Sequence, residues 1–225
     1  DGKMRATLSV NKVTRQGKAY QVGRVVIGQI HAKNDEPIRL YYRKLPQNKY
    51  GSLYFAHDPE IGKESWVTVI GSRADRADNP DDGIALDEIF TYEIEVKGVR
   101  EGDATIPMLH LTITRDDGSQ VSIEPFDMRD SGFSTDDEFM FFKAGAYTGN
   151  NTSPQPETDY DQVTFYELEY SHNKPPAGPW IDKLVAAEKA KKLALLTEVT
   201  PPNPAEAGVI IDDSFTDGDR AGGAD

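Results

Sequence analysis

At 225 residues the chain is long enough for one β-sandwich with a substantial core, or for one domain with an appendage. It has no cysteine, which excludes disulfides and thiolate metal sites, and no apolar run approaches the roughly 20 residues of a membrane-spanning helix. The formal net charge of −13 has the wrong sign for a protein that neutralises phosphates, so we expect neither a nucleic-acid nor a membrane partner.

Most of the chain shows the short alternating patterns that are typical of strands. Residues 4–13 alternate between apolar and polar side chains, which predicts a half-buried strand. Residues 21–32 begin apolar on both faces, as expected for a strand inside a sandwich. Further strands are expected at residues 38–44, 52–56, 66–72, 91–97, 109–115, 120–125, 139–147 and 162–171. Many short strands with almost no helical periodicity predict an all-β fold, an antiparallel β-sandwich or jelly roll.

The character of the sequence changes at Asn173. Residues 174–179 form a proline-rich linker, and residues 180–198 carry apolar side chains at helical spacing. A second proline-rich break leads into an acidic, glycine-rich end. We therefore expect a sandwich over residues 1–172, followed over residues 173–225 by a linker, a helix and a tail.

Two short strings carry residues suited to chemistry. In Gln29-Ile30-His31, strand geometry places the amide and the imidazole on one face, about 7 Å apart at a rise of roughly 3.3 Å per residue, with Ile30 on the other face. The alternative is that His31 is a hydrogen-bonded structural residue, which is the commoner role of a histidine in a strand.

The second string is Phe-Phe-Lys-Ala-Gly-Ala-Tyr at residues 141–147, followed by Thr-Gly-Asn-Asn. Alternation puts Lys143, Gly145 and Tyr147 on a common face, where the glycine leaves the backbone open to close approach. An ordinary sheet face is the alternative interpretation.

Together, in this order and with this spacing, the two strings resemble the alginate lyases of polysaccharide lyase families seven and eighteen. That family shows Gln-Ile-His on one strand and Tyr-Phe-Lys-Ala-Gly-x-Tyr, commonly followed by Asn-Gln, on another. Here Phe141 replaces the first tyrosine and Thr148-Gly149 replaces Asn-Gln. The resemblance covers roughly residues 1–171 and implies a jelly-roll β-sandwich with a cleft across one sheet, acting on alginate in a secreted or periplasmic location.

One part of the family pattern is absent. The family has a further string, Arg-(Ser/Thr)-Glu-Leu-Arg, on a strand well before Gln-Ile-His, and its arginine helps to neutralise the substrate carboxylate. No such string occurs here, so residues 1–172 are expected to be an incomplete alginate-lyase-like sandwich that lacks about its first third. Either another chain supplies this part, or the sequence is a fragment or a rearrangement of a longer one.

The resemblance also implies a reaction and the residues that carry it. The expected reaction is β-elimination, in which Gln29 binds the uronate carboxylate, a neutral His31 takes the proton on C5, and Tyr147 donates a proton to the departing oxygen. Lys143 would bind a neighbouring carboxylate. Further candidate substrate contacts are Arg39, Tyr41, Arg43 and Asn150.

Other features of the sequence leave alternatives open. No cofactor and no metal are expected, although acid pairs such as Asp81-Asp82 leave calcium as an alternative. The remaining histidines, His57, His110 and His172, are expected to be structural or solvent-facing. Within the family, the isoleucine of Gln-Ile-His is associated with activity on guluronate-containing blocks, and we expect the chain to act within the polymer. The alternative functions are a non-catalytic carbohydrate-binding sandwich and a lyase for another polyuronate such as glucuronan.

Overall fold

The computed structural model describes residues 1–32, 36–131, 140–173 and 190. The chain divides into two units, Asp1–Pro175 and Pro176–Asp225, and every described strand belongs to the first. The expected linker and tail lie outside the described residues, and so does the expected helix except for Ala190, which is helical.

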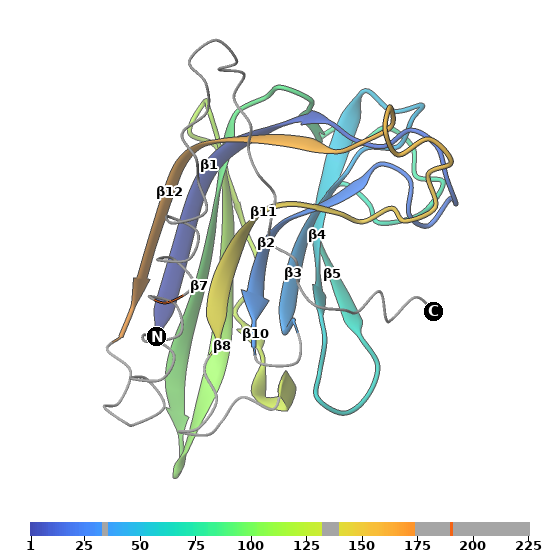
Figure 1. Cartoon of the computed structure of the whole chain (residues 1–225). Coiled ribbons are helices and arrows are strands. Elements are labelled where there is room, and N and C mark those ends of the chain that lie inside the picture. The colour runs from blue at the N-terminus through green and yellow to red at the C-terminus, as the bar shows by residue number, and fades with distance from the viewer. Residues whose placement is uncertain (33–35, 132–139, 174–189, 191–225) are drawn as a thin grey trace. The chain divides into compact units, whose positions relative to one another are not determined.

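The first unit consists of two antiparallel sheets (Figure 1). Sheet A has the order β10-β8-β7-β1-β12, with β9 beside β8, and sheet B has the order β11-β2-β3-β4-β5, with β6 beside β4. The strands of sheet A are β1 (Gly2–Lys12), β7 (Phe90–Glu101), β8 (Ala104–Arg115), β9 (Gln120–Ser122), β10 (Phe126–Asp127) and β12 (Gln162–His172). Those of sheet B are β2 (Arg24–His31), β3 (Ile38–Arg43), β4 (Tyr50–His57), β5 (Ser65–Ile70), β6 (Ile84–Ala85) and β11 (Phe141–Thr148), and one 3-10 turn, η1, spans Arg129–Ser131. This confirms the expected jelly-roll β-sandwich.

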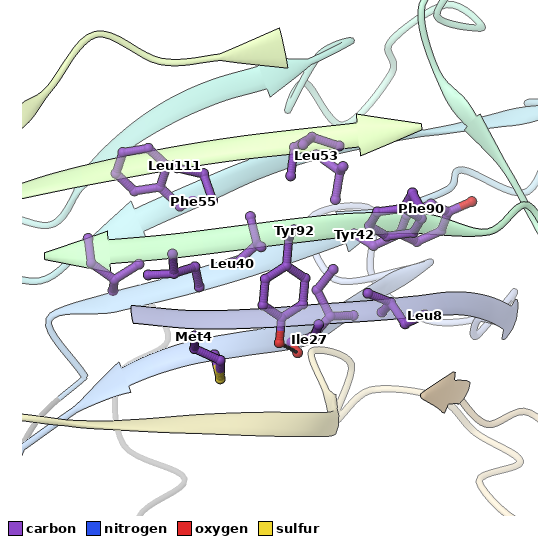
Figure 2. Close-up of a cluster of buried hydrophobic side chains, with 14 of the residues drawn as sticks. Met4, Leu8, Ile27, Leu40, Tyr42, Leu53, Phe55, Phe90, Tyr92 and Leu111 are labelled. Atoms are coloured by element: carbon purple, nitrogen blue, oxygen red, sulfur yellow. Dashed lines mark hydrogen bonds between the residues drawn. The ribbon is translucent and has the colours of Figure 1, made fainter. Parts of the chain in front are cut away.

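The core lies between the two sheets and follows the alternation read from the sequence. Met4, Ala6 and Leu8 of β1 are buried, while the residues between them are only partly covered. In Figure 2, Leu8 of sheet A and Ile27 of sheet B belong to the same buried cluster. Burying a side chain of this size fully contributes about 1.5–3 kcal/mol, so the continuous apolar layer is the main stabilisation of the sandwich.

All ten strands expected from the sequence are present, but their lengths differ. The hairpin of β7 and β8 continues to Glu101 and Ala104 around Gly102, which has a φ of 62°. Apart from the buried Ile106, the residues of this extension are exposed or only partly covered, so the sequence shows no clear alternation there. The two-residue strands β6 and β10 were not predicted, because two residues are too few to show a period.

A β-bulge in β2 sets the orientation of the residues that follow it. Val26 pairs with Tyr41 of β3 while Gly28 pairs with the preceding residue of β3, so β2 contains one extra residue at this point. The hydroxyl of Tyr92, in the opposite sheet, donates to the carbonyl of Ile27 at 2.9 Å, and a Cβ on Gly28 would lie 2.9 Å from the Tyr92 ring. The bulge therefore brings Val26 and Gln29 to the same face, whereas simple alternation would place them on opposite faces.

Asp159 is one of the residues that attach the loop before β12 to the segment after β1. Asp159 accepts hydrogen bonds from the amides of Arg15 (2.7 Å) and Gln16 (3.0 Å) and from the hydroxyl of Ser153 (2.9 Å). Burial opposes ionisation of Asp159, but these bonds outweigh it and hold the pKa of the carboxyl below its ordinary value.

Asp159→Ala is expected to lower the free energy of unfolding at neutral pH by about 1.5–3 kcal/mol, because it removes hydrogen bonds to a charged acceptor. A carboxyl whose pKa is lowered in the folded state stabilises the fold at pH values above its ordinary pKa. This contribution is lost as the pH falls through the pKa of the folded state. Denaturant unfolding at about pH 7 and about pH 3 should therefore show a smaller difference between wild type and variant in acid. Asp103→Ala, in the exposed turn between β7 and β8, is the control and should change little at either pH.

Candidate active site

Six of the candidate residues lie on the outer face of sheet B, the face turned away from the core: Gln29, His31, Arg39, Tyr41, Lys143 and Tyr147. One row of register partners crosses five strands there: Lys143, Gln29, Arg39, Ala56 and Trp66. Partners in such a row have Cβ atoms about 4.5–5.5 Å apart. Gln29 is thus flanked on its two neighbouring strands by Lys143 of β11 and Arg39 of β3.

His31 lies on the same face, two residues further along β2. Its ring stacks on Phe141 with centroids 5.0 Å apart, and its Nδ1 bonds to the carbonyl of Ala32. Because a carbonyl can only accept, Nδ1 is the donor in this bond, and in the neutral form of the ring the lone pair then lies on Nε2. Nε2 is 3.5 Å from a carboxylate oxygen of Glu36, which can pair with the imidazolium once His31 has taken a proton.

Ile30, between these two residues, faces the core. It is 1% exposed and belongs to the main apolar cluster. The expected division of the Gln-Ile-His string between two faces is confirmed.

Tyr147 lies on the outer face at the far end of β11. It pairs with Val26, and a register irregularity separates it from Ala144. Its side chain is 60% exposed, so the hydroxyl is open to a ligand. A Cβ on Gly145 would meet no atom within 4 Å, so no described contact requires a glycine at this position.

Arg39 is held by acidic residues from the connection between β4 and β5. Its guanidinium pairs with Glu64 and lies 3.7 Å from Asp58, and its Nε is buried without a described partner. Burial raises the pKa of Glu64, and the charge of Arg39 lowers it by less. Arg39 therefore contributes less free positive charge to the outer face than the sequence alone indicates.

Tyr41 belongs to an aromatic cluster on this face. Its ring lies 5.4 Å from that of Tyr54 and 5.5 Å from that of Trp66, and Arg24 lies over it at 5.3 Å. Arg73 lies over Trp66 at 4.6 Å. The sequence analysis did not name Tyr54, Trp66, Arg24 or Arg73 as site residues. Their positions on the outward-facing side of the strands, or at the strand ends, are the signal that could have identified them.

Two other candidates are engaged within the protein. Arg43 is buried, and its guanidinium donates to the carbonyls of Ala19, Val22 and Arg73 and pairs with Asp75. The arrangement gives Arg43 a role in holding loops together and does not support a substrate contact.

Asn150 is also buried, and its amide donates to the hydroxyl of Thr14 and the carbonyl of Gln16. It too is placed as a loop anchor, so its geometry does not support the expected substrate contact.

The other histidines lie apart from this face. His57 is buried, with Nδ1 bonded to the carbonyl of Pro37 at 2.9 Å and Nε2 to Asp130 at 2.7 Å, while His172 stacks on Phe142. Within the part of the chain that the structure describes, no three His, Asp or Glu side chains gather as metal ligands would. No helix in that part is long and apolar enough to cross a membrane.

The fold and the row of polar residues define a β-sandwich protein with a candidate site on one open sheet face. A sequence model of the alginate lyase family matches residues 1–172. The chain belongs to this alginate lyase family. An alginate lyase of Klebsiella pneumoniae is 46% identical over 181 residues, which are 76% of this chain and 55% of that relative.

Solved structures show the same likeness. The crystal structure of the alginate lyase from Klebsiella pneumoniae matches with a TM-score of 0.67 at 44% identity, over 77% of this chain and 60% of that one. The exolytic PL7 alginate lyase from Zobellia galactanivorans matches with a TM-score of 0.60 at 23% identity, over 78% of this chain and 75% of that one, a likeness that bears on the fold alone. The chain thus spans little more than half the length of the Klebsiella relatives it matches.

Proposed function

We propose that the chain carries the catalytic sheet of an alginate lyase that cleaves its acidic polysaccharide by β-elimination at a 4-linked uronate. The observation that carries the proposal is the pairing of Gln29, flanked by Lys143 and Arg39, with a neighbouring His31 whose Nε2 has a free lone pair. Family membership and the matched relatives support the substrate class. Since alginate is an extracellular polymer, a secreted or periplasmic location belongs to the same proposal.

The proposed chemistry assigns one task to each residue. Gln29 donates to the uronate carboxylate, and the charge of Lys143 beside it stabilises the negative charge that develops when the C5 proton leaves. His31 takes that proton on Nε2. The electron pair of the C5–H bond forms the C4–C5 double bond, the C4–O bond breaks, and Tyr147 gives its proton to the departing oxygen. Exchange with solvent returns the proton from His31 and replaces the one lost by Tyr147.

The assay follows the ultraviolet absorbance of the new conjugated double bond. Because the chain spans 55% of its Klebsiella relative, it is tested alone and mixed with the remainder of that relative as a separate polypeptide, a mixture we call the complemented chain. Absorbance should rise with alginate as substrate. Reducing ends released without absorbance would mean hydrolysis and would overturn the mechanism; alginate binding without turnover would favour the carbohydrate-binding alternative, and turnover of glucuronan alone would favour the other lyase.

Endolytic action and a preference for guluronate-containing blocks are part of the proposal, and the preference for guluronate rests on the Gln-Ile-His string. The complemented chain should lower the viscosity of alginate well before absorbance reaches its plateau, and it should act faster on guluronate-rich than on mannuronate-rich blocks. A clear mannuronate preference would contradict the assignment.

Ile30→Val should change the ratio of the two initial rates by less than the tenfold that about 1.4 kcal/mol represents, because Ile30 lies in the core and reaches the substrate only through the strand. The loss of one methylene should cost about 0.5–1.5 kcal/mol of stability. Initial rates on guluronate-rich and mannuronate-rich blocks, measured with the same preparation of the variant, test the expected change in the ratio. A larger change in the ratio would show that Ile30 acts on the sugar directly.

A further inference from the structure

Arg24, at the start of β2, lies on the outer face of sheet B and has no task in the mechanism above. Val26 pairs with Tyr147, and the amide of Gly149 donates to the carbonyl of Arg24 at 2.9 Å. Arg24 is two residues from Val26 on the same face of β2, so it is a diagonal neighbour of Tyr147. Such neighbours are about 7–8 Å apart, which a long side chain can span.

Contacts on two sides hold the Arg24 side chain in place. Its Nε donates to the carbonyl of Gly149 at 3.1 Å, and its guanidinium lies over the ring of Tyr41, 5.3 Å from the centroid. A Cβ on Gly149 would lie 2.8 Å from Cγ and 2.9 Å from Nε of Arg24. This glycine, one of the two residues that replace Asn-Gln of the family pattern, therefore leaves room for the arginine. A guanidinium held in this way loses little conformational freedom when it binds a ligand.

The two terminal nitrogens of Arg24 are open to an anion. In the part of the chain that the structure describes, the Nε bond is the only hydrogen bond of this side chain, and no carboxylate pairs with it. Arg39 and Arg43 of β3, in contrast, are both engaged in ion pairs with acidic residues. A planar guanidinium whose terminal nitrogens are open can donate two parallel hydrogen bonds to one carboxylate.

The order of the residues along the sheet indicates which sugar lies near Arg24. Tyr147 lies between Gln29, which binds the carboxylate of the reacting uronate, and Arg24 on the other side. When the C4–O bond breaks beside Tyr147, the departing oxygen stays with the neighbouring sugar of the polymer. That sugar lies on the Arg24 side of Tyr147, and in alginate it carries a carboxylate of its own.

We propose that Arg24 determines specificity by binding the carboxylate of the uronate that carries the departing oxygen. The site then selects a bond with a uronate on both sides, and it discriminates against a neutral sugar on the departing side. The inference rests on the proposed function, because the places of the two sugars follow from the tasks of Gln29 and Tyr147.

The test uses two synthetic oligosaccharides of equal length that differ only in the sugar that carries the departing oxygen. This sugar is a uronate in the first compound and the corresponding neutral hexose in the second. The complemented chain should show a kcat/KM about tenfold higher or more for the first compound, because the second cannot accept charge-assisted hydrogen bonds from Arg24. Arg24→Met, which keeps an unbranched side chain beside Tyr41, should act on the two compounds with kcat/KM values within about twofold of each other.

Arg100→Met is the matched control. Arg100 is exposed, lies on β7 in the other sheet, and its substitution changes the net charge of the chain equally. This variant should keep the preference of wild type. The proposal is wrong if wild type shows no preference, or if the preference survives in Arg24→Met. It is also wrong if Arg24→Met loses kcat/KM equally on both compounds, since Arg24 would then only hold the end of β11.

The affinities of the full chain for the two compounds distinguish this proposal from the proposed function. They are measured with Tyr147→Phe, in which cleavage is expected to be slow. Tighter binding of the first compound that depends on Arg24, with no turnover in any sample, supports the carboxylate site and rejects the elimination. Turnover with equal affinities and equal kcat/KM values for the two compounds does the reverse.

Discussion

Tyr147→Phe is expected to reduce turnover of alginate by the complemented chain by about 10²- to 10⁴-fold, the range for removal of a positioned proton donor. The hydroxyl carries the proton that the departing oxygen needs. The substitution keeps the ring and removes only the hydroxyl, and because the side chain is 60% exposed little packing is disturbed. Polymer binding should therefore change little, and initial rates and alginate affinity measured on the same preparation separate the two effects.

The matched control is Tyr166→Phe. Tyr166 is also exposed and its hydroxyl contacts Ser9 at 3.2 Å, but it lies on β12, away from the outer face of sheet B. Its loss should leave turnover unchanged. If Tyr147→Phe retained most of its activity, the proton would have to come from another group, and the assignment of Tyr147 would be wrong.

The sequence was sufficient to predict ten of the twelve described strands, and it also predicted the faces on which Gln29, Ile30 and His31 lie, because these depend on local alternation. It was not sufficient for Arg43 and Asn150. Both are polar residues at the end of a strand or just beyond it, a placement that suits a substrate contact and a loop anchor equally. Their partners come from distant loops, Asp75 for Arg43 and Thr14 for Asn150, and no local pattern shows such contacts.

The charge of the site also depends on residues that are distant in the sequence. Basic residues cluster in the sequence between residues 24 and 49. The fold brings acids to the same place: Glu64 pairs with Arg39, and Glu36 lies beside His31. Lys143 of β11 lies opposite Gln29 and is the cation that the proposed function assigns to the uronate carboxylate.

The bulge in β2 is the feature of the site that depends most on a distant residue. Tyr92 fills the space beside Gly28 and bonds to the carbonyl of Ile27, and this contact between sheets shifts the alternation so that Gln29 and His31 share a face with Val26. A glycine within a strand indicates a bulge or a close approach, but only the fold identifies the side chain that approaches.

Gly28→Ala is expected to lower the free energy of unfolding by about 1–3 kcal/mol, because its Cβ would lie 2.9 Å from the buried ring of Tyr92. Turnover by the folded protein should fall by about tenfold or more, since moving Tyr92 or the bulge shifts Gln29 and His31, and misplacement by about 1 Å can cost about 10²-fold. Thermal unfolding and initial rates, corrected for the folded fraction, measure the two effects.

Gly51→Ala is the matched control for this prediction. Gly51 also lies beside a core tyrosine, and its Cβ would be still closer, with Tyr42 clashing at the start of β4 rather than in β2. This variant should lose at least as much stability, yet the turnover of its folded fraction should stay within about twofold of wild type. If instead the two variants lost turnover in proportion to their stability, Gly28 would matter only for packing. The bulge would then have no part in positioning Gln29 and His31.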